Sequence, residues 1–169
     1  MSISWGTEQS AAISNYGLNY NYGHQTDFHQ NTAIISYRNA EVTNSSGDSF
    51  NYVGEVSVFN RSSAGSAWSV VATLRPDDSD IAKSLYFGYS IGIHNKYVVV
   101  GHNKSTLNHV YVFKGDSNNS YTKIAKLTSD VSTGGHFGKT VSINGNYICV
   151  SKHDSNAIYV FKNDGSDGF

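Results

Sequence analysis

The feature that most constrains the fold is a segment that returns about fifty residues further along the chain. Each copy has an aromatic residue followed by glycine, a first apolar run, and a second apolar run that ends in phenylalanine. The two clearest copies begin at Phe87-Gly88 and Phe137-Gly138, so their starts lie 137 − 87 = 50 residues apart. A period of this length is typical of arrays in which each unit buries its apolar faces against its neighbours. The chain is therefore predicted to be a repeat protein.

The apolar runs of the repeats predict buried strands. The copies align on a small residue that follows the first run, namely Ser36, Gly101 and Ser151. The first runs occupy residues 33–35, 98–100 and 148–150, and the second runs occupy residues 55–59, 109–113 and 157–161. Short continuous apolar runs are typical of strands that are buried on both faces. Cys149, inside the last of the first runs, is accordingly expected to be an inert core thiol.

A further strand opens on an aromatic residue in each copy. Trp68 and Tyr121 begin the clear examples, and their alternation of apolar and polar positions indicates one wetter face. Trp5 fits the same position ahead of Tyr16-Gly17, which is taken as the aromatic-glycine pair of the first copy.

Tight turns are predicted between the aromatic-glycine strand and the first apolar run. In the second and third copies they fall at residues 94–96 and 144–146, and the Asn-Gly of the latter supplies the positive φ that a two-residue hairpin needs. The first copy is predicted to be irregular in two places. Residues 20–31 are interpreted as longer than their counterparts, and residues 41–52 as an inserted loop rich in Ser, Asn and Gly.

The composition favours an all-β fold. Glycine (16) and tyrosine (12) are plentiful, proline occurs once, and only 15% of the residues are charged, so helix-filling residues are scarce. Four-stranded antiparallel units that repeat every ~40 to 50 residues are the sequence form of β-propeller blades. We expect one repeat domain over residues 1–169, with three four-stranded antiparallel repeats at approximately 5–67, 68–120 and 121–169.

The motifs also resemble a known family. The Phe-Gly pair, the V-x-I segment before the turn and the Y-V-F strand are similar to the FG-GAP repeats of integrin-α-type β-propellers. The similarity is strong over residues 68–169 and weaker before them. It implies an extracellular or surface propeller that binds proteins or sugars.

Members of that family hold calcium in an Asp-rich loop between the first two strands, and this chain departs from the pattern. The corresponding turns at 94–96 and 144–146 contain no carboxylate, whereas calcium takes roughly six to eight oxygen ligands. The Asp-rich segments 77–80 and 164–168 are interpreted as turns. No metal and no cofactor are therefore expected.

Three repeats are fewer than the roughly four to eight blades of a propeller. We expect either a homo-oligomer, most simply two chains in a six-bladed ring, or a piece of a longer propeller. Phe169 aligns with Tyr121 as the first residue of a further outer strand. In a closed ring the strand at Trp5 would complete the last blade.

Charge and hydropathy exclude some partners. A formal net charge of −1 and a pI near 6.6 provide no basic field for nucleic acid. The sequence contains neither a run of eighteen apolar residues nor a recognisable signal peptide, so no membrane insertion is expected. The chain is interpreted as cytoplasmic, or as a mature piece of a secreted protein. A single cysteine excludes an internal disulfide framework.

No catalytic constellation is recognisable. The seven histidines show no spacing typical of metal ligands, and no Ser-His-Asp pattern has the strand-turn-helix context of a nucleophile elbow. The chain is therefore predicted not to be an enzyme. A hydrolase would require a deep polar pocket in which a histidine is hydrogen-bonded to a serine or cysteine.

The leading hypothesis is a binding or adhesion module whose loops contact a protein or glycan, because loops on a rigid scaffold commonly carry binding. The loop near Asp48 is a second candidate surface, and the alternative is a structural protein whose exposed sheet ends drive ring or filament assembly. The predicted contact residues follow the first apolar runs: Tyr37, Arg38, His102, Asn103, Lys104, Lys152, His153 and Asp154.

Overall fold

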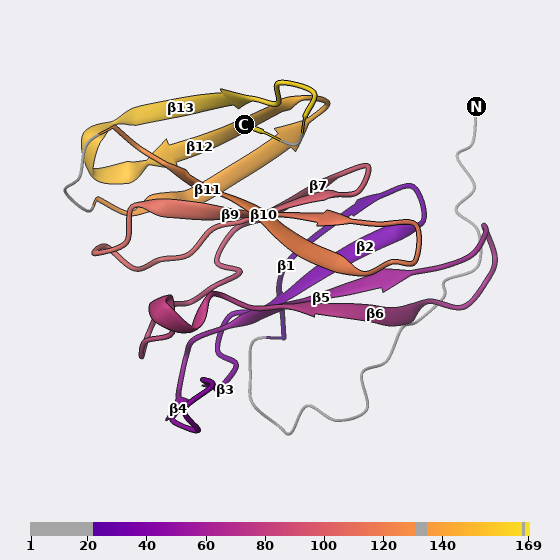
Figure 1. Cartoon of the computed structure of the whole chain (residues 1–169), viewed down its shortest axis with the longest axis horizontal. Coiled ribbons are helices and arrows are strands. Elements are labelled where there is room, and N and C mark those ends of the chain that lie inside the picture. The colour runs from indigo at the N-terminus through magenta and orange to yellow at the C-terminus, as the bar shows by residue number, and fades with distance from the viewer. Residues whose placement is uncertain (1–21, 131–134, 167) are drawn as a thin grey trace, which may run out of the picture.

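The computed structural model describes residues 22–130, 135–166, 168 and 169, which form an all-β structure (Figure 1). The first sheet contains β1 (Tyr22–His29), β2 (Thr32–Tyr37), β5 (Glu55–Asn60) and β6 (Ser69–Leu74). The second sheet contains β7 (Ile91–His94), β8 (Tyr97–Val100), β9 (His109–Gly115) and β10 (Tyr121–Thr128). The third sheet contains β11 (Phe137–Asn144), β12 (Tyr147–Lys152) and β13 (Ala157–Lys162). A short hairpin of β3 (Val42–Thr43) and β4 (Ser49–Phe50) forms a fourth sheet.

The all-β prediction is confirmed, and the three larger sheets are antiparallel meanders stacked in chain order (Figure 1). They form an open stack and do not close into a ring. The short 3₁₀ helices η1 (Asp78–Asp80) and η2 (His153–Ser155) lie in connections. No helix in the described residues has the length and hydrophobicity to cross a membrane.

Each outer strand pairs with the strand that precedes it in the chain. β6 pairs with β5, and β10 pairs with β9. The strands opened by Trp68 and Tyr121 therefore belong to the sheets that begin at Tyr22 and near Phe87. Among the described strands, β13 has only β12 as a neighbour. The strand expected at Trp5 lies outside the described residues.

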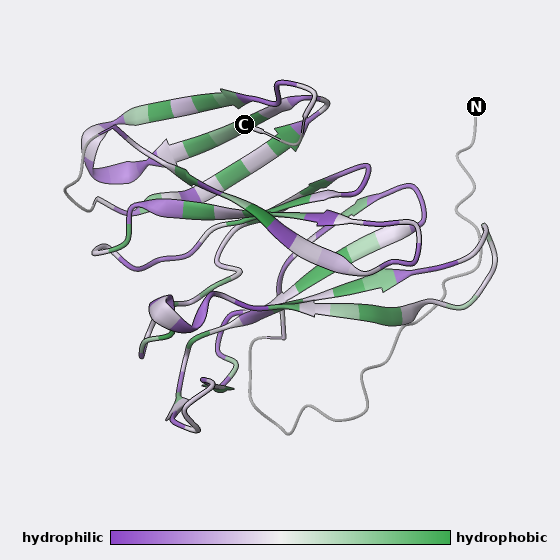
Figure 2. Cartoon of the chain, viewed as in Figure 1, coloured by the Kyte–Doolittle hydropathy of each residue, from purple (hydrophilic) through white to green (hydrophobic). Residues whose placement is uncertain are grey.

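Two apolar cores separate the three sheets, and Figure 2 shows the hydrophobic stretches on their central strands. The first core lies between the first and second sheets and the other between the second and third. Side chains of β8 alternate between them: Val98 and Val100 join the first core, and Val99 joins the second. Strand β8 is thus buried on both faces, as the continuous apolar run 98–100 predicts.

The aromatic-glycine pair of the first sheet is Tyr22-Gly23. Tyr22 precedes Ser36 by 36 − 22 = 14 residues, which equals the spacings 101 − 87 = 14 and 151 − 137 = 14 of the other copies. Gly23, Gly88 and Gly138 share positive φ values of 85°, 82° and 89°. The assignment of this position to Tyr16-Gly17, which lie outside the described residues, is therefore wrong.

The prediction that residues 20–31 are longer than their counterparts is wrong for the same reason. The β1–β2 turn has the same two-residue length as the turns of the other sheets, and its first residue again has positive φ. These residues are Gln30 (55°), Asn95 (53°) and Gly145 (56°). Glutamine carries no sequence signal for this conformation, so the turn was not recognised. The inserted segment 41–52 contains the β3–β4 hairpin.

A serine hydroxyl fixes the start of two sheets in the same way. The backbone N–H of Gln25 donates to Ser36 Oγ at 3.0 Å, and the N–H of Thr140 donates to Ser151 Oγ at 3.0 Å. Both bonds lie where the pairing register of the first strand shifts, so each hydroxyl satisfies a donor that the ladder leaves unpaired. In the second sheet Gly101 takes the serine position, and its N–H donates to the carbonyl of Ser90 at 2.9 Å.

The expectation that Cys149 is buried is wrong. Its side chain is exposed, because it belongs to the face of the third sheet that points away from the second sheet. Val99, at the same position of the second sheet, is buried because the third sheet covers it.

Candidate functional site

Loops that follow the second strand of two sheets meet at an open pocket. Arg38 follows β2 and Asn103 follows β8, and the pocket they share has a volume of about 540 Å³. We refer to it as the Tyr–Arg pocket. Its lining residues are Arg38, Asn39, Tyr52, Tyr86, Tyr89 and Asn103. Two of the predicted contact residues, Arg38 and Asn103, thus line one pocket although they follow second strands of different sheets.

Aromatic rings surround the guanidinium of Arg38. The centre of the guanidinium lies 6.0 Å from the ring centre of Tyr86 and 5.9 Å from that of Tyr89. The ring of Tyr52 is in turn 6.1 Å from that of Tyr86. These distances are at the outer limit of cation–π attraction. The rings therefore lie around the cation on the lining of the pocket.

Two polar atoms of the pocket are buried without a hydrogen-bond partner among the described residues. They are the donor Nε of Arg38 and the acceptor Oδ1 of Asn103. The backbone of Asn103 is held by an N–H donated to the Leu85 carbonyl at 3.2 Å, so the amide is positioned while its oxygen is unsatisfied. An unpaired buried polar group costs about 1–3 kcal/mol.

A second pocket of about 400 Å³ adjoins the first one and shares Tyr89 with it. We refer to it as the inner-strand pocket. His24, Tyr89 and Lys139 line it from the same repeat position, two residues after Tyr22, Phe87 and Phe137. The next positions, Gln25, Ser90 and Thr140, also line it. Since β7 contacts both β1 and β11, the first strands of all three sheets converge here.

His24 lies at the boundary between the two pockets. Its ring centre is 5.4 Å from that of Tyr89. Burial, and then the positive charge of Arg38, lower the pKa of the His24 imidazole. Burial and the cation that lines the Tyr–Arg pocket therefore both favour the neutral form of His24.

Of the residues predicted in the third loop, His153 reaches a pocket. It lines the inner-strand pocket and is exposed. Asp154 accepts hydrogen bonds from His153 Nδ1 at 3.1 Å and from His136 Nδ1 at 3.2 Å. Hydrogen bonds from His153 and His136 lower the pKa of the Asp154 carboxyl. Asp154 thus orients the two imidazoles at the rim.

The expectation that His102 contacts a ligand is not supported by its position, because the side chain is fully buried. Its Nδ1 accepts the backbone N–H of Lys104 at 3.1 Å, and its ring packs at 5.7 Å from that of His109. Burial, and then the charge of His109, lower the pKa of His102 to about 4. His102 is therefore a neutral core residue that shapes the loop carrying Asn103.

Three other predicted residues also have structural roles. Tyr37 is buried, with its ring 6.0 Å from that of Tyr22. Lys152 is buried and donates through Nζ to Ser129 Oγ at 3.2 Å. Lys104 donates through Nζ to the Lys83 carbonyl at 3.0 Å. Lysine and tyrosine side chains are long enough to bury their stems beneath a loop, so a polar residue at the end of a strand did not guarantee exposure.

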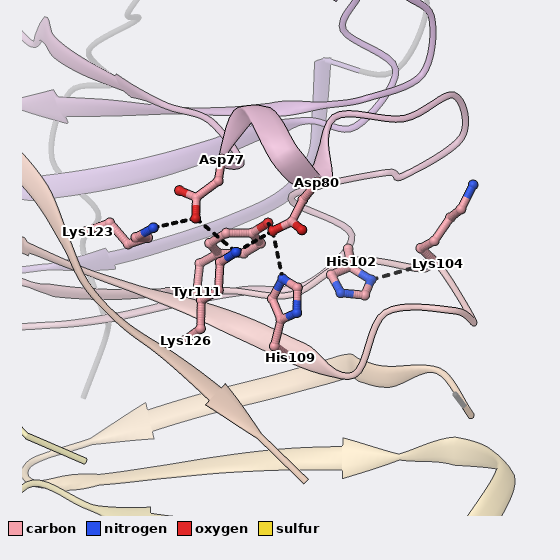
Figure 3. A network of polar contacts seen from close by, with 8 residues as sticks. All are labelled: Asp77, Asp80, His102, Lys104, His109, Tyr111, Lys123 and Lys126. Atoms are coloured by element: carbon pink, nitrogen blue, oxygen red, sulfur yellow. Dashed lines mark hydrogen bonds and ion pairs between the residues drawn. The ribbon is translucent and has the colours of Figure 1, made fainter. Parts of the chain in front are cut away.

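A polar network fixes the connection between the first and second sheets (Figure 3). Asp80 of η1 accepts hydrogen bonds from His109 Nε2 at 3.1 Å, from Lys126 Nζ at 2.6 Å and from the Tyr111 hydroxyl. Asp77 pairs with Lys126 at 2.9 Å and with Lys123. Every carboxylate of this network has cationic partners, so it serves to clamp η1 to β9 and β10.

The charges of this network shift one another's ionisation. Burial raises the pKa of Asp80, but hydrogen bonds from Lys126 and Tyr111 and the charges of His109 and Lys126 outweigh it, so the pKa lies below its ordinary value. Burial lowers the pKa of Lys126, and its bonds to Asp77 and Asp80 raise it above the usual range. Both groups are thus held in their charged forms.

The second predicted surface, near Asp48, is a tight turn of the β3–β4 hairpin. Asp48 donates its backbone N–H to Asn44 Oδ1 at 2.8 Å, and Ser45 donates its N–H to Asp78 Oδ2 at 3.1 Å. The hairpin is thereby attached to η1. It is a separate surface, since no residue of its turn lines the Tyr–Arg pocket.

Metal-ligand geometry is not found in the described residues. No group of three or more His, Cys, Asp or Glu side chains converges there on a possible metal position. Oδ1 of Asp164 accepts backbone N–H groups from Ser166 at 2.8 Å and Gly168 at 3.3 Å, which closes a turn. Asp167, in the same segment, lies outside the described residues.

The tyrosines of the pocket were missed by the sequence interpretation, which assigned most tyrosines to packing between sheets. Tyr86 and Tyr89 flank Phe87-Gly88, where the third copy has His136 and Lys139. A position that other copies fill with histidine or lysine does not need an aromatic ring for packing. This departure from the repeat is the signal that could have identified them.

No protein-family model matches the chain, and no curated protein shows significant sequence similarity to it. Function must therefore be inferred from the residues and geometry of the site. The similarity to FG-GAP repeats stays an expectation from the motifs themselves.

Proposed function

We propose that the chain is a binding module that takes a hydroxyl-bearing ligand, a glycan, in the Tyr–Arg pocket. The observation that carries this proposal is a pair of buried atoms, Arg38 Nε and Asn103 Oδ1, that have no hydrogen-bond partner among the described residues and belong to side chains that line one open pocket. One is a donor and the other an acceptor, and a sugar hydroxyl can serve both kinds of group.

The rest of the lining suits the same class of ligand. Tyr52, Tyr86 and Tyr89 offer flat apolar faces with polar tips, which provide contact area at little cost in conformational entropy. None of the described residues that line the pocket is acidic, and Arg38 adds a positive charge. Neutral sugars and sugars with carboxylate groups are both compatible with these contacts, whereas a cationic ligand would be repelled.

We further infer that the three sheets are blades of a β-propeller of the FG-GAP type. The support comes from the repeated meander order, from the convergence of β1, β7 and β11, and from the inner-strand pocket lined by equivalent positions of three sheets. Ligands commonly bind where loops of such a scaffold converge. In this arrangement the Tyr–Arg pocket lies between two neighbouring blades, beside the axis.

A glycan array followed by titration of the strongest ligand tests the proposal. The wild-type chain is compared with Arg38→Ala and Tyr89→Ala. Removing the charged donor or the shared ring is expected to weaken binding by about tenfold or more, which corresponds to ~1.4 kcal/mol. Both side chains are partly exposed, so the variants are expected to fold.

Arg61→Ala is the matched control. Arg61 lies over Trp68 at 4.8 Å and donates to Asn31, away from the pocket. Its removal changes the net charge as Arg38→Ala does and should leave glycan affinity unchanged. Absence of glycan binding by the wild-type chain, or equal affinities of all variants, would refute the proposal.

A further inference from the structure

The outward face of the third sheet is exposed at the positions that the other sheets bury. We call Cys149, Ile158 and Val160 the outward triplet. Ile158 is 76% and Val160 57% exposed, and Cys149 is also exposed. The same positions of the first two sheets are Ile34, Val56 and Val58, and Val99, Val110 and Val112, all 0% exposed.

The buried triplets are covered by the sheet that follows. Ile34, Val56 and Val58 lie in the core shared with the second sheet, and Val99, Val110 and Val112 in the core shared with the third. The second and third sheets also share a lysine–tyrosine contact at equivalent positions. Lys114 Nζ is 5.4 Å from the ring centre of Tyr97, and Lys162 Nζ is 5.9 Å from that of Tyr147. The equivalent surface is therefore covered by the next sheet in the first and second sheets, whereas in the third sheet the outward triplet is exposed.

The strand β1 carries the complementary half of the same contact. Phe28 follows Tyr22 by 28 − 22 = 6 residues, as Ile93 follows Phe87 (93 − 87 = 6) and Ile143 follows Phe137 (143 − 137 = 6). Ile93 and Ile143 are buried in the two cores. Phe28 is 72% exposed.

The space beside Gly23 is likewise unoccupied by described atoms. A Cβ on Gly88 would lie 2.9 Å from Ser36 Cβ, and a Cβ on Gly138 would lie 2.4 Å from Val110 Cγ1, so both glycines pack on the preceding sheet. A Cβ on Gly23 would meet no described atom within 4 Å. The start of β1 therefore resembles the packed starts of β7 and β11, but no sheet formed by the described residues lies against it.

We propose that a second copy of the chain covers the outward triplet, with β1 of one copy against β12 and β13 of the other. The contact continues the interface that the chain already makes between its own sheets. Ser57 and Phe59 of β5 lie on the same face of the first sheet as Phe28, and both are buried. The proposed contact is therefore made by β1 and not by β5. The inference does not depend on the ligand of the Tyr–Arg pocket.

The two halves lie on different surfaces, so the contact is head-to-tail. Such contacts either close into rings or extend into filaments. Two chains of three sheets make six, which is within the roughly four to eight blades of known propellers. The expected assembly is therefore a closed pair of chains in which the contact is made twice.

Light-scattering mass at several concentrations, with charge substitutions on each half, tests the proposal. The wild-type chain should reach twice its 18.4 kDa mass. Phe28→Lys and Ile158→Lys should each remain at the single-chain mass. Ser46→Lys, on the exposed β3–β4 turn, adds the same charge elsewhere and should still pair.

Mixing the two variants distinguishes a head-to-tail pair from other assemblies. Phe28→Lys retains an intact Ile158, and Ile158→Lys retains an intact Phe28, so one unaltered contact can form between them. An equimolar mixture should therefore regain a two-chain mass that neither variant shows alone, which also proves that both variants are folded. A wild-type chain that stays single at all concentrations would overturn the proposal. So would a pair that only Ile158→Lys disrupts, because a symmetric contact between two third sheets would then be present.

Discussion

Gly138 lies directly against Val110: a Cβ on this glycine would come within 2.4 Å of Val110 Cγ1. One sheet earlier, a Cβ on Gly88 would lie 3.0 Å from Val56 Cγ2. Both glycines have positive φ, which L side chains rarely adopt. The glycine of the aromatic-glycine pair in the second and third sheets is thus explained by close packing of each sheet on the preceding one.

Alanine substitution measures this packing. Gly138→Ala should lower the free energy of unfolding by about 3 kcal/mol, because ~1–2 kcal/mol of backbone strain adds to a contact that cannot open freely. Gly47→Ala is the control, since Gly47 has the same φ of +89° and no described atom within 4 Å of its Cβ position. It should show the strain alone. Equal losses in urea unfolding would mean that Gly138 has no special role in packing.

Much of the scaffold could be predicted because strand signals are local. The runs 98–100 and 109–113 are apolar, β-branched or aromatic, and both form strands. The turn predicted at residues 144–146 forms, with Gly145 and Asn146 as its two loop residues. Burial of Cys149 could not be predicted, because it depends on whether another sheet covers the third one. A strand's own residues do not contain that information.

The pH dependence of stability is expected to report His102. Its pKa of about 4 in the folded chain lies below the ordinary 6.5. Below pH 6.5 the imidazole of His102 therefore binds a proton in the unfolded chain, whereas in the folded chain it does so only near pH 4. The contribution of His102 to the free energy of unfolding is fully present above pH 6.5 and is lost as the pH falls towards 4. Between pH 7 and pH 5 the loss from His102 is about 2 kcal/mol.

Urea unfolding of wild type, His102→Gln and His153→Gln at the two pH values checks this assignment. His102→Gln should flatten most of the slope, while the exposed His153→Gln should retain it. Burial also lowers the pKa of His109, so a smaller slope of the same sign is expected to persist. An unchanged slope in His102→Gln would show that other groups cause the dependence.

The clamp of η1 on the second sheet makes a further prediction. Asp80→Asn leaves Lys126 without its 2.6 Å ion pair and should lower the free energy of unfolding by about 2 kcal/mol at pH 7. Because the folded pKa of Asp80 is below 3.8, its contribution is present above pH 3.8 and is lost as the pH falls through the lower folded value. Wild type and variant should therefore converge in strong acid.

Asp77→Asn provides the comparison for Asp80→Asn. The Asp77 side chain is 32% exposed against 12% for Asp80, and water therefore screens its ion pairs more strongly. Its replacement should cost less in the same unfolding experiment. A larger cost for Asp77→Asn would show that η1 is held mainly through the outer pair.

The candidate site was only partly predictable. Arg38 and Asn103 could be placed at one end of the molecule because both follow second strands of equivalent sheets. Tyr52 could not be placed there, since it reaches the pocket from an insertion that has no counterpart in the other copies. His102 precedes Asn103 in the same loop, but its side chain is buried in the core while Asn103 lines the pocket. Whether a loop residue is buried or lines the pocket thus changes from one residue to the next.

The central claim is that the outward triplet is a packing surface of the same kind as the two that the chain buries, and Cys149 tests it most directly. Cys149 is the single cysteine of the chain, so its reaction rate with a maleimide can be followed as the protein concentration is raised. We predict that the thiol reacts rapidly in dilute solution and is protected as chains pair, with Phe28→Lys remaining reactive throughout. A rate that is the same at every concentration in the wild-type chain would contradict the account.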